Sequence, residues 1–233
     1  MARGTQLTIL IDQLRAAIGH SQNAALGQNF RPGMIVALQK EQERLYRLWD
    51  WTHLKIKREV TMAAGSREYA MPSDIEPERA MSAWFREAAS IGAGGWKPIS
   101  YGITLDHYNV SDSGNVSVRN DPVRAWMIVE NQIEVWPRPA TDGGKLMIEG
   151  IKKLGPLTAD NHTADLDDGL IVGFVAARML AKQKDPSASR VLEEAQSLYL
   201  RLIGAPVARQ QTIIMGGGVD PSEGAYHDWE LQV

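Results

Sequence analysis

The chain has 233 residues, and its hydrophobic content of 44% and charged content of 23% are ordinary for a globular protein. Its 25 basic and 28 acidic residues give a formal net charge of -3, which argues against a protein whose main task is gripping the phosphate backbone of nucleic acid. The sequence contains no cysteine. Disulfides, thiolate nucleophiles and cysteine zinc sites are therefore excluded, and a reducing cytoplasm is favoured.

The first twenty residues do not form a signal peptide, because Asp12, Gln13 and Arg15 interrupt their apolar pattern. No stretch approaches the roughly 20 consecutive apolar residues of a membrane span. We therefore expect a soluble protein that is made inside the cell and has no membrane partner.

Two amphipathic helices are predicted before residue 56. Residues 5–18 carry leucine and isoleucine at helical spacing, and Gly19 is placed to end that helix. A second helix begins near Pro32, a residue tolerated in the first turn, and runs to residue 49.

The pattern changes to short strands between residues 56 and 156. Residues 56–62 and 67–71 flank Gly65 and Ser66, which predicts a β-hairpin. Pro98 demotes a neighbouring strand to the edge of the sheet. The remaining strands are expected at 80–85, 96–101, 124–130, 132–136 and 145–151, with a tight hairpin turn at Asn131.

Helical periodicity returns at residue 165. One strongly apolar helix covers residues 165–184, and a second begins after Ser187 and ends at Gly204 and Pro206. The fold class is therefore α+β: an antiparallel helical bundle built from both chain ends, a small inserted antiparallel β lobe and an extended C-terminal arm. The expected boundaries are 1–55 with 157–207 for the bundle, 56–156 for the lobe and 208–233 for the arm.

No catalytic or metal-binding motif is present. The five histidines lack metal-ligand spacing, and no nucleophile elbow or phosphate-binding loop occurs, so we expect no enzyme activity, cofactor or metal. Asp165, Asp167 and Asp168 could form an acid/base or metal site. Because they precede an apolar helix, we favour capping of that helix.

Trp49 and Trp51 flank Asp50 at the end of the second helix. Two interpretations fit this pattern: a stacking platform for a base or sugar, or a packed junction between the bundle and the β lobe. We favour the junction, since aromatic side chains bury large areas where elements meet.

The last segment is aperiodic and rich in glycine, and yet it carries large apolar side chains. Disorder is one interpretation of such a segment. Burial of a large apolar side chain gains roughly 1.5–3 kcal/mol, so docking on the chain's own bundle or on a neighbour is the better one. The predicted docking residues are Ile213, Ile214, Met215, Tyr226, Trp229 and Leu231, and the predicted hinge is Gly216, Gly217 and Gly218.

Several segments, taken in order, resemble the head–tail connector adaptors of tailed bacteriophages. They are ALGQN after the first helix, LYRLWDWTHLK at the end of the second, REVTMAAGSREYAMPSDI, QIEVWPRPA, KLMIEGIKKL, and ADLDDGLIVGFVAARMLAKQK. The LWDW element and the IEVWP strand are the most specific.

The resemblance implies a virion protein at the capsid–tail junction, assembled in the host cytoplasm. It implies a homo-oligomeric ring, typically of twelve copies, beneath the portal protein. Such a ring extends the channel for double-stranded DNA during ejection, without sequence-specific binding, and carries the next tail component: a nozzle, stopper or tail-tube protein. It also implies that the segment from Arg209 onward docks on the portal.

Two other hypotheses remain. One is a nucleic-acid-binding or regulatory module that uses the bundle with Trp49 and Trp51. The other is a hydrolase that uses Asp165, Asp167 or Asp168.

Overall fold

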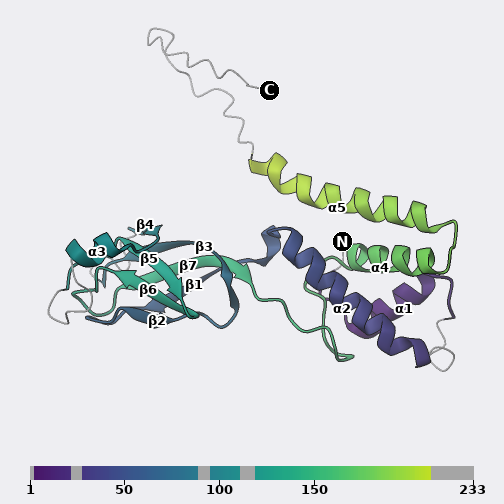
Figure 1. The fold of residues 1–233 in the computed structure, drawn as a ribbon, viewed down its shortest axis with the longest axis horizontal. Helices are drawn as coiled ribbons and strands as arrows, with labels where there is room; N and C mark the ends of the chain where they lie inside the picture. Colours follow the sequence, from purple (N-terminus) through teal and green to yellow (C-terminus); the bar gives the residue numbers. More distant parts are fainter. Residues whose placement is uncertain (1–2, 22–27, 89–94, 111–118, 211–233) are drawn as a thin grey trace, which may run out of the picture.

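The computed structural model describes residues 3–21, 28–88, 95–110 and 119–210 of the chain. In Figure 1 four long helices lie at one end of an elongated molecule, and a curled sheet lies at the other. The chain enters the sheet after α2 and returns to the helices after β7. The α+β class expected from the sequence is confirmed.

The four long helices form where the apolar periodicity predicts them. Gly19, at φ 70°, adopts the left-handed conformation directly after α1. Asp167 caps α4, because its Oδ1 accepts a hydrogen bond from the Leu170 N–H at 3.2 Å. The long helices are α1 (Leu7–Ala17), α2 (Arg31–Leu48), α4 (Asp168–Lys182) and α5 (Ala188–Gln210), and the short α3 (Leu105–Val110) lies beside the sheet.

The prediction that Gly204 and Pro206 end the last helix is wrong, because α5 continues to Gln210. A proline inside a helix removes one backbone hydrogen bond, which a long helix can lose without ending. With 23 residues, α5 is about 34 Å long at 1.5 Å per residue.

Helices from both ends of the chain share one hydrophobic core. The apolar helix α4 is its centre, contacting α1, α2 and α5. Trp51, just after α2, and Leu157, after β7, belong to the same core. Its fully buried leucine and isoleucine side chains include Leu7, Leu10, Leu14, Leu38, Leu45, Leu166, Leu170 and Ile171.

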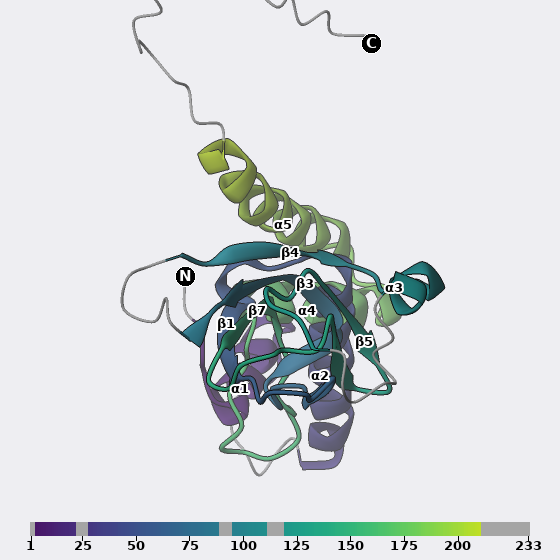
Figure 2. The ribbon, with the colours of Figure 1, turned by 90° about the vertical axis from the view of Figure 1, so that its left-hand side faces the viewer.

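Seven strands form one sheet in the order β1-β7-β3-β4-β5-β6-β2. The strands are β1 (Lys55–Thr61), β2 (Glu68–Ala70), β3 (Ile75–Arg86), β4 (Lys97–Tyr101), β5 (Ala125–Val129), β6 (Gln132–Trp136) and β7 (Lys145–Lys152). Figure 2 views the sheet from its end, where it curls around a second core that includes Phe85, Trp126 and Ile148.

The expectation of a purely antiparallel lobe is corrected, because β4 and β5 are parallel. The connection between them contains α3, and a crossover of this length lets two strands run in the same direction. The prediction of a hairpin at residues 56–71 is also wrong. β1 pairs with β7 and β2 pairs with β6, so the two strands lie at opposite ends of the strand order.

The tight hairpin predicted around Asn131 is confirmed. Glu130 and Asn131 both have positive φ, 47° and 67°, as a two-residue hairpin turn requires, and they join β5 to β6.

The prediction that Pro98 lies in an edge strand is wrong. Pro98 pairs with Trp84 of β3, whereas β5 pairs with β4 only from Ser100 onward, so the missing N–H of Pro98 costs no ladder bond.

Gly150 of β7 supplies a test of the sheet packing. A Cβ at this buried position would lie 2.7 Å from the Ile75 Cγ2 and 3.2 Å from the backbone at Arg79 and Ala80. Gly150→Ala should therefore lower the free energy of unfolding by about 1–3 kcal/mol in urea denaturation. Gly33→Ala is the matched control, because a Cβ there meets open space. Equal stability of the two variants would contradict the packing described here.

Candidate functional site: the junction between α2 and the sheet

The residues that end α2 join the helical core to the sheet. Trp51 is 4% exposed, and its Nε1 donates a hydrogen bond to the Leu45 carbonyl at 2.9 Å. Its ring meets Tyr199 of α5 edge-on, with the ring centroids 6.2 Å apart. Trp49 is half-buried and Asp50 is exposed. Trp51 is thus a core residue with its polar group already paired.

Arg79 of β3 closes the end of α2. Its guanidinium donates to the carbonyl of Tyr46 at 2.7 Å and to that of Trp49 at 2.9 Å, and it forms an ion pair with Asp50. The last carbonyls of a helix have no partner within the helix and carry partial negative charge. A strand side chain therefore satisfies the helix end and fixes its position against the sheet.

Tyr46 lies beneath this contact. The Arg79 guanidinium is 4.5 Å from the centre of its ring, and its hydroxyl donates to the Lys152 carbonyl at 3.0 Å. Burial raises the pKa of the Tyr46 hydroxyl above its ordinary value of 10.0, and the neighbouring Arg79 opposes that rise. The neutral hydroxyl is the hydrogen-bond donor that the end of β7 uses.

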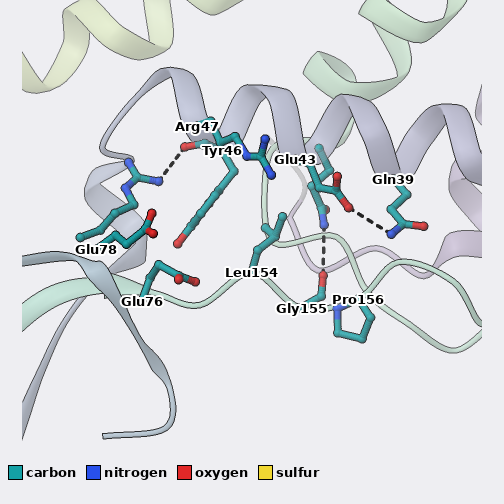
Figure 3. A pocket seen from close by; sticks show the side chains of 11 residues that line it. Gln39, Glu43, Tyr46, Arg47, Glu76, Glu78, Leu154, Gly155 and Pro156 are labelled. Carbon is teal, nitrogen blue, oxygen red and sulfur yellow. Dashed lines mark hydrogen bonds between the residues drawn. The ribbon is translucent and has the colours of Figure 1, made fainter. Parts of the chain in front are cut away.

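A cavity of about 610 Å³ opens beside the junction. Figure 3 shows Gln39, Glu43, Tyr46 and Arg47 of α2 on one side of it and Glu76, Glu78 and the segment Leu154–Pro156 on the other. The described side chains that line it include three glutamates and two arginines, but no serine, cysteine or histidine. This composition provides polar recognition without a nucleophile–base pair.

The segment after β7 is tied to the helices by Asp165. Its Oδ2 accepts from the Gly155 N–H at 2.7 Å, and its Oδ1 lies 3.0 Å from the Lys152 ammonium. The Gln42 side chain accepts from the Asp165 N–H at 3.2 Å. These contacts hold the return connection against α2.

Asp167 and Asp168 begin α4. The capping interpretation is confirmed for Asp167, and Asp168 accepts a hydrogen bond from the Thr5 hydroxyl. The structure thus brings the three aspartates to one region, where Asp165 and Asp168 hold neighbouring segments and Asp167 caps its own helix. Within the described ranges no group of three or more potential metal ligands occurs, and no helix is long and apolar enough to cross a bilayer.

The buried cluster around Glu41 was not predicted. This carboxylate, fully buried on α2, pairs with Arg44 on the same helix and with Arg178 of α4 at 2.6 Å. Arg79 was missed as well. Neither pairing leaves a local sequence signal, because Arg178 and Arg79 are far along the chain from their partners.

The predicted docking and hinge residues lie outside the described residues. They are Ile213, Ile214, Met215, Gly216, Gly217, Gly218, Tyr226, Trp229 and Leu231. The tail that carries these residues begins after Gln210, the last residue of α5.

Comparison with known proteins gives one family. The family model described as SU10 adaptor protein matches residues 5–219, which is most of the chain. No curated protein matches the sequence.

Arg79 gives a direct test of the junction. Arg79→Met removes its hydrogen bonds to the Tyr46 carbonyl in α2 and to the Trp49 carbonyl just after it, and it leaves Asp50 without this ion pair. The free energy of unfolding should therefore fall by about 1–3 kcal/mol. Arg190→Met is the matched control, because its pair with Glu194 is solvent-exposed and should change stability by less than about 0.5 kcal/mol. Urea denaturation of both variants measures the difference; similar losses would refute the role given to Arg79.

Asp168 should make stability depend on pH. Burial raises the pKa of its carboxyl above 3.8, Asp167 adds to the rise, and the Thr5 hydroxyl opposes it. The folded state therefore binds this proton more tightly than the unfolded state, and the resulting stabilisation is lost as pH rises through the raised pKa. Asp168→Asn lacks this loss, so its stability relative to the parent should increase as pH rises above 3.8.

Asp185→Asn is the control with the opposite sign. Hydrogen bonds from Ser187 lower the pKa of the Asp185 carboxyl, so the parent gains stability as pH rises and the variant does not. Denaturation curves at several pH values should show the two relative stabilities moving in opposite directions. Parallel movement would show that the Asp168 carboxyl does not titrate as described.

Proposed function

Since the chain belongs to the SU10 adaptor protein family, a phage head–tail adaptor family, we propose that twelve copies form a ring under the portal. Membership makes the chain a virion component at the head–tail junction. In the proposal the ring extends the DNA channel and carries the nozzle, stopper or tail-tube protein that follows. The family match over residues 5–219 is the observation that carries it.

Exposed apolar side chains support self-assembly. Leu192 and Leu200 on α5 are 38% and 67% exposed, Ile9 on α1 is 48% exposed, and Val36 on α2 is 47% exposed. They lie on α1, α2 and α5, so more than one helix exposes apolar side chains to a neighbouring copy. A closed ring needs two different complementary faces on each subunit, unlike a two-fold dimer.

The charge of the chain is consistent with a channel that lets DNA pass. A net charge of -3 gives no general attraction to a polyanion, so DNA would move through the ring without tight binding. No sequence-specific contact is proposed.

The division of the chain follows its two cores. We assign residues 1–55 and 157–207 to one antiparallel bundle, residues 56–156 to the β lobe, and the tail from residue 208 to the docking arm. The helical core and the sheet core are separate clusters of buried side chains, which supports this division. Because α5 runs to Gln210, the arm can change its path only after that residue.

The alternative of a nucleic-acid-binding module finds less support. Trp51 would have to leave the core and break its bond to Leu45 before it could stack on a base. A hydrolase is weaker still, because Asp165 and Asp167 are engaged in holding backbone N–H groups.

Removing the tail tests the docking claim. A chain that ends at Gln210 keeps α5 and should fold, but it should lose binding to portal rings of the same phage. Two matched triple variants then locate the anchor: Ile213, Ile214 and Met215 to serine, or Tyr226, Trp229 and Leu231 to serine. We expect the first to weaken binding at least tenfold, since three buried apolar side chains are lost.

Portal binding is measured by co-sedimentation with portal rings. Circular dichroism of each variant serves as the control for folding. Full binding by the chain that ends at Gln210 would rule out docking through the tail.

A further inference from the structure

A groove lies where α1 ends, α2 begins and α4 ends, and in Figure 1 these helix ends are the part of the helical layer farthest from the sheet. It has a volume of about 390 Å³, and α1, α2 and α4 all contribute to it. Ligand-binding pockets commonly have volumes of roughly 300–1,000 Å³, so it can hold a large side chain. The lining residues are Ile18, His20, Asn29, Phe30, Gly33, Met34, Ala37, Val175, Arg178, Met179, Lys182 and Gln183.

The groove is apolar at its floor and basic at its rim. Ile18, Met34 and Val175 are buried, whereas Phe30 is 62% exposed at the opening. Lys182 at the rim is exposed and has no ion-pair partner in the part of the chain that the structure describes. Among the described residues that line the groove, none is acidic. This combination fits a peptide that carries both a large apolar side chain and carboxylates.

The tail of this chain has that chemistry. Residues 211–233 contain four acidic residues, Asp220, Glu223, Asp228 and Glu230, and no lysine or arginine. Trp229 stands between the last two acidic residues, with Tyr226 and Leu231 nearby. Its indole would enter the apolar floor while Asp228 and Glu230 face Lys182.

The N-terminus of α2 adds to the charge complementarity. This helix has no side-chain cap and no acidic residue in its first turn, and Phe30 and Gly33 line the groove there. The partial positive charge at the start of a helix favours a carboxylate nearby.

The tail is also long enough to reach the groove of its own subunit. A tight turn at residues 183–187 places the start of α5 beside the end of α4, so the groove lies about one α5 length, roughly 34 Å, from residue 210. Residues 211–225, fully extended at roughly 3.3 Å each, span about 50 Å. A tethered segment that can span the distance binds at a high effective concentration.

We propose that, before assembly, the segment Tyr226–Leu231 binds the groove between α1, α2 and α4 of its own subunit. This inference rests on the proposed function in one respect, which is that Ile213–Met215 dock on the portal. The terminal segment then holds the arm against its own helical layer until the portal engages the anchor. The groove is the site, and an acidic peptide that contains tryptophan is its ligand.

The absence of cysteine from the chain allows a clean cross-linking test. Leu231→Cys and Gln183→Cys together should form a disulfide within one subunit of the full-length protein at nanomolar concentration. A monomeric cross-linked band that forms at a rate independent of protein concentration is the expected result. Cross-links only between two copies, or an equal rate when Ser222→Cys replaces Leu231→Cys, would overturn the proposal.

Two variants test the groove itself. Gly33→Trp fills it, because a Cβ at Gly33 meets open space, and should slow cross-linking about tenfold, whereas Gly33→Ala should not. Lys182→Glu should slow it several-fold, and Glu230→Lys in the same chain should restore the rate. Lys40→Glu, an exposed position outside the groove, is the control for charge. Unchanged rates in both Gly33→Trp and Lys182→Glu would overturn the proposal.

Portal binding of the same variants keeps the two proposals separate. Gly33→Trp should bind portal rings at least as tightly as the parent, because it releases the arm and leaves Ile213–Met215 intact. If the cross-link forms but deletion of residues 211–233 leaves portal binding unchanged, the proposed docking fails and the groove interaction stands. If deletion abolishes portal binding but the cross-link does not depend on the groove, the proposed docking stands and the groove interaction fails.

Discussion

The contact between Arg79 and the end of α2 fixes how the two cores of this protein meet. A strand side chain donates hydrogen bonds to the carbonyl of Tyr46, in the last turn of the helix, and to that of Trp49, the residue directly after it. The neighbouring contacts repeat this arrangement: the Tyr46 hydroxyl pairs with a β7 carbonyl, and Asp165 holds the return connection. Helical layer and sheet are therefore joined by hydrogen bonds to backbone groups, which depend on orientation more strictly than apolar contact does.

This junction matters for the proposed function, in which the protein holds two neighbours at once. In the proposed assembly, the tail that leaves α5 reaches the portal, and other surfaces of the ring meet the next tail component. A stiff connection between the helical layer and the sheet keeps those contacts in register. Trp51 strengthens it by linking the end of α2 to Tyr199 of α5, the helix from which the tail departs.

Sequence periodicity predicted the elements well and their partners poorly. The four long helices, the Asn131 hairpin and the Asp167 cap depend on residues close together in the chain, so local rules were sufficient. The pairing of β1 with β7 and of β2 with β6 joins distant segments, and adjacency in sequence wrongly favoured β1 with β2. Trp51 at the junction was predictable as a packing residue. The contacts of Arg79 and the pair of Glu41 with Arg178 were not, since these partners are distant in the sequence.

The most direct test of the central claim is electron microscopy of the purified chain mixed with portal rings of the same phage. The account predicts an additional ring, with one copy of this chain for each portal subunit, stacked on one face of the portal and coaxial with its channel. Portal rings that remain bare at micromolar concentrations of the folded full-length chain would contradict it.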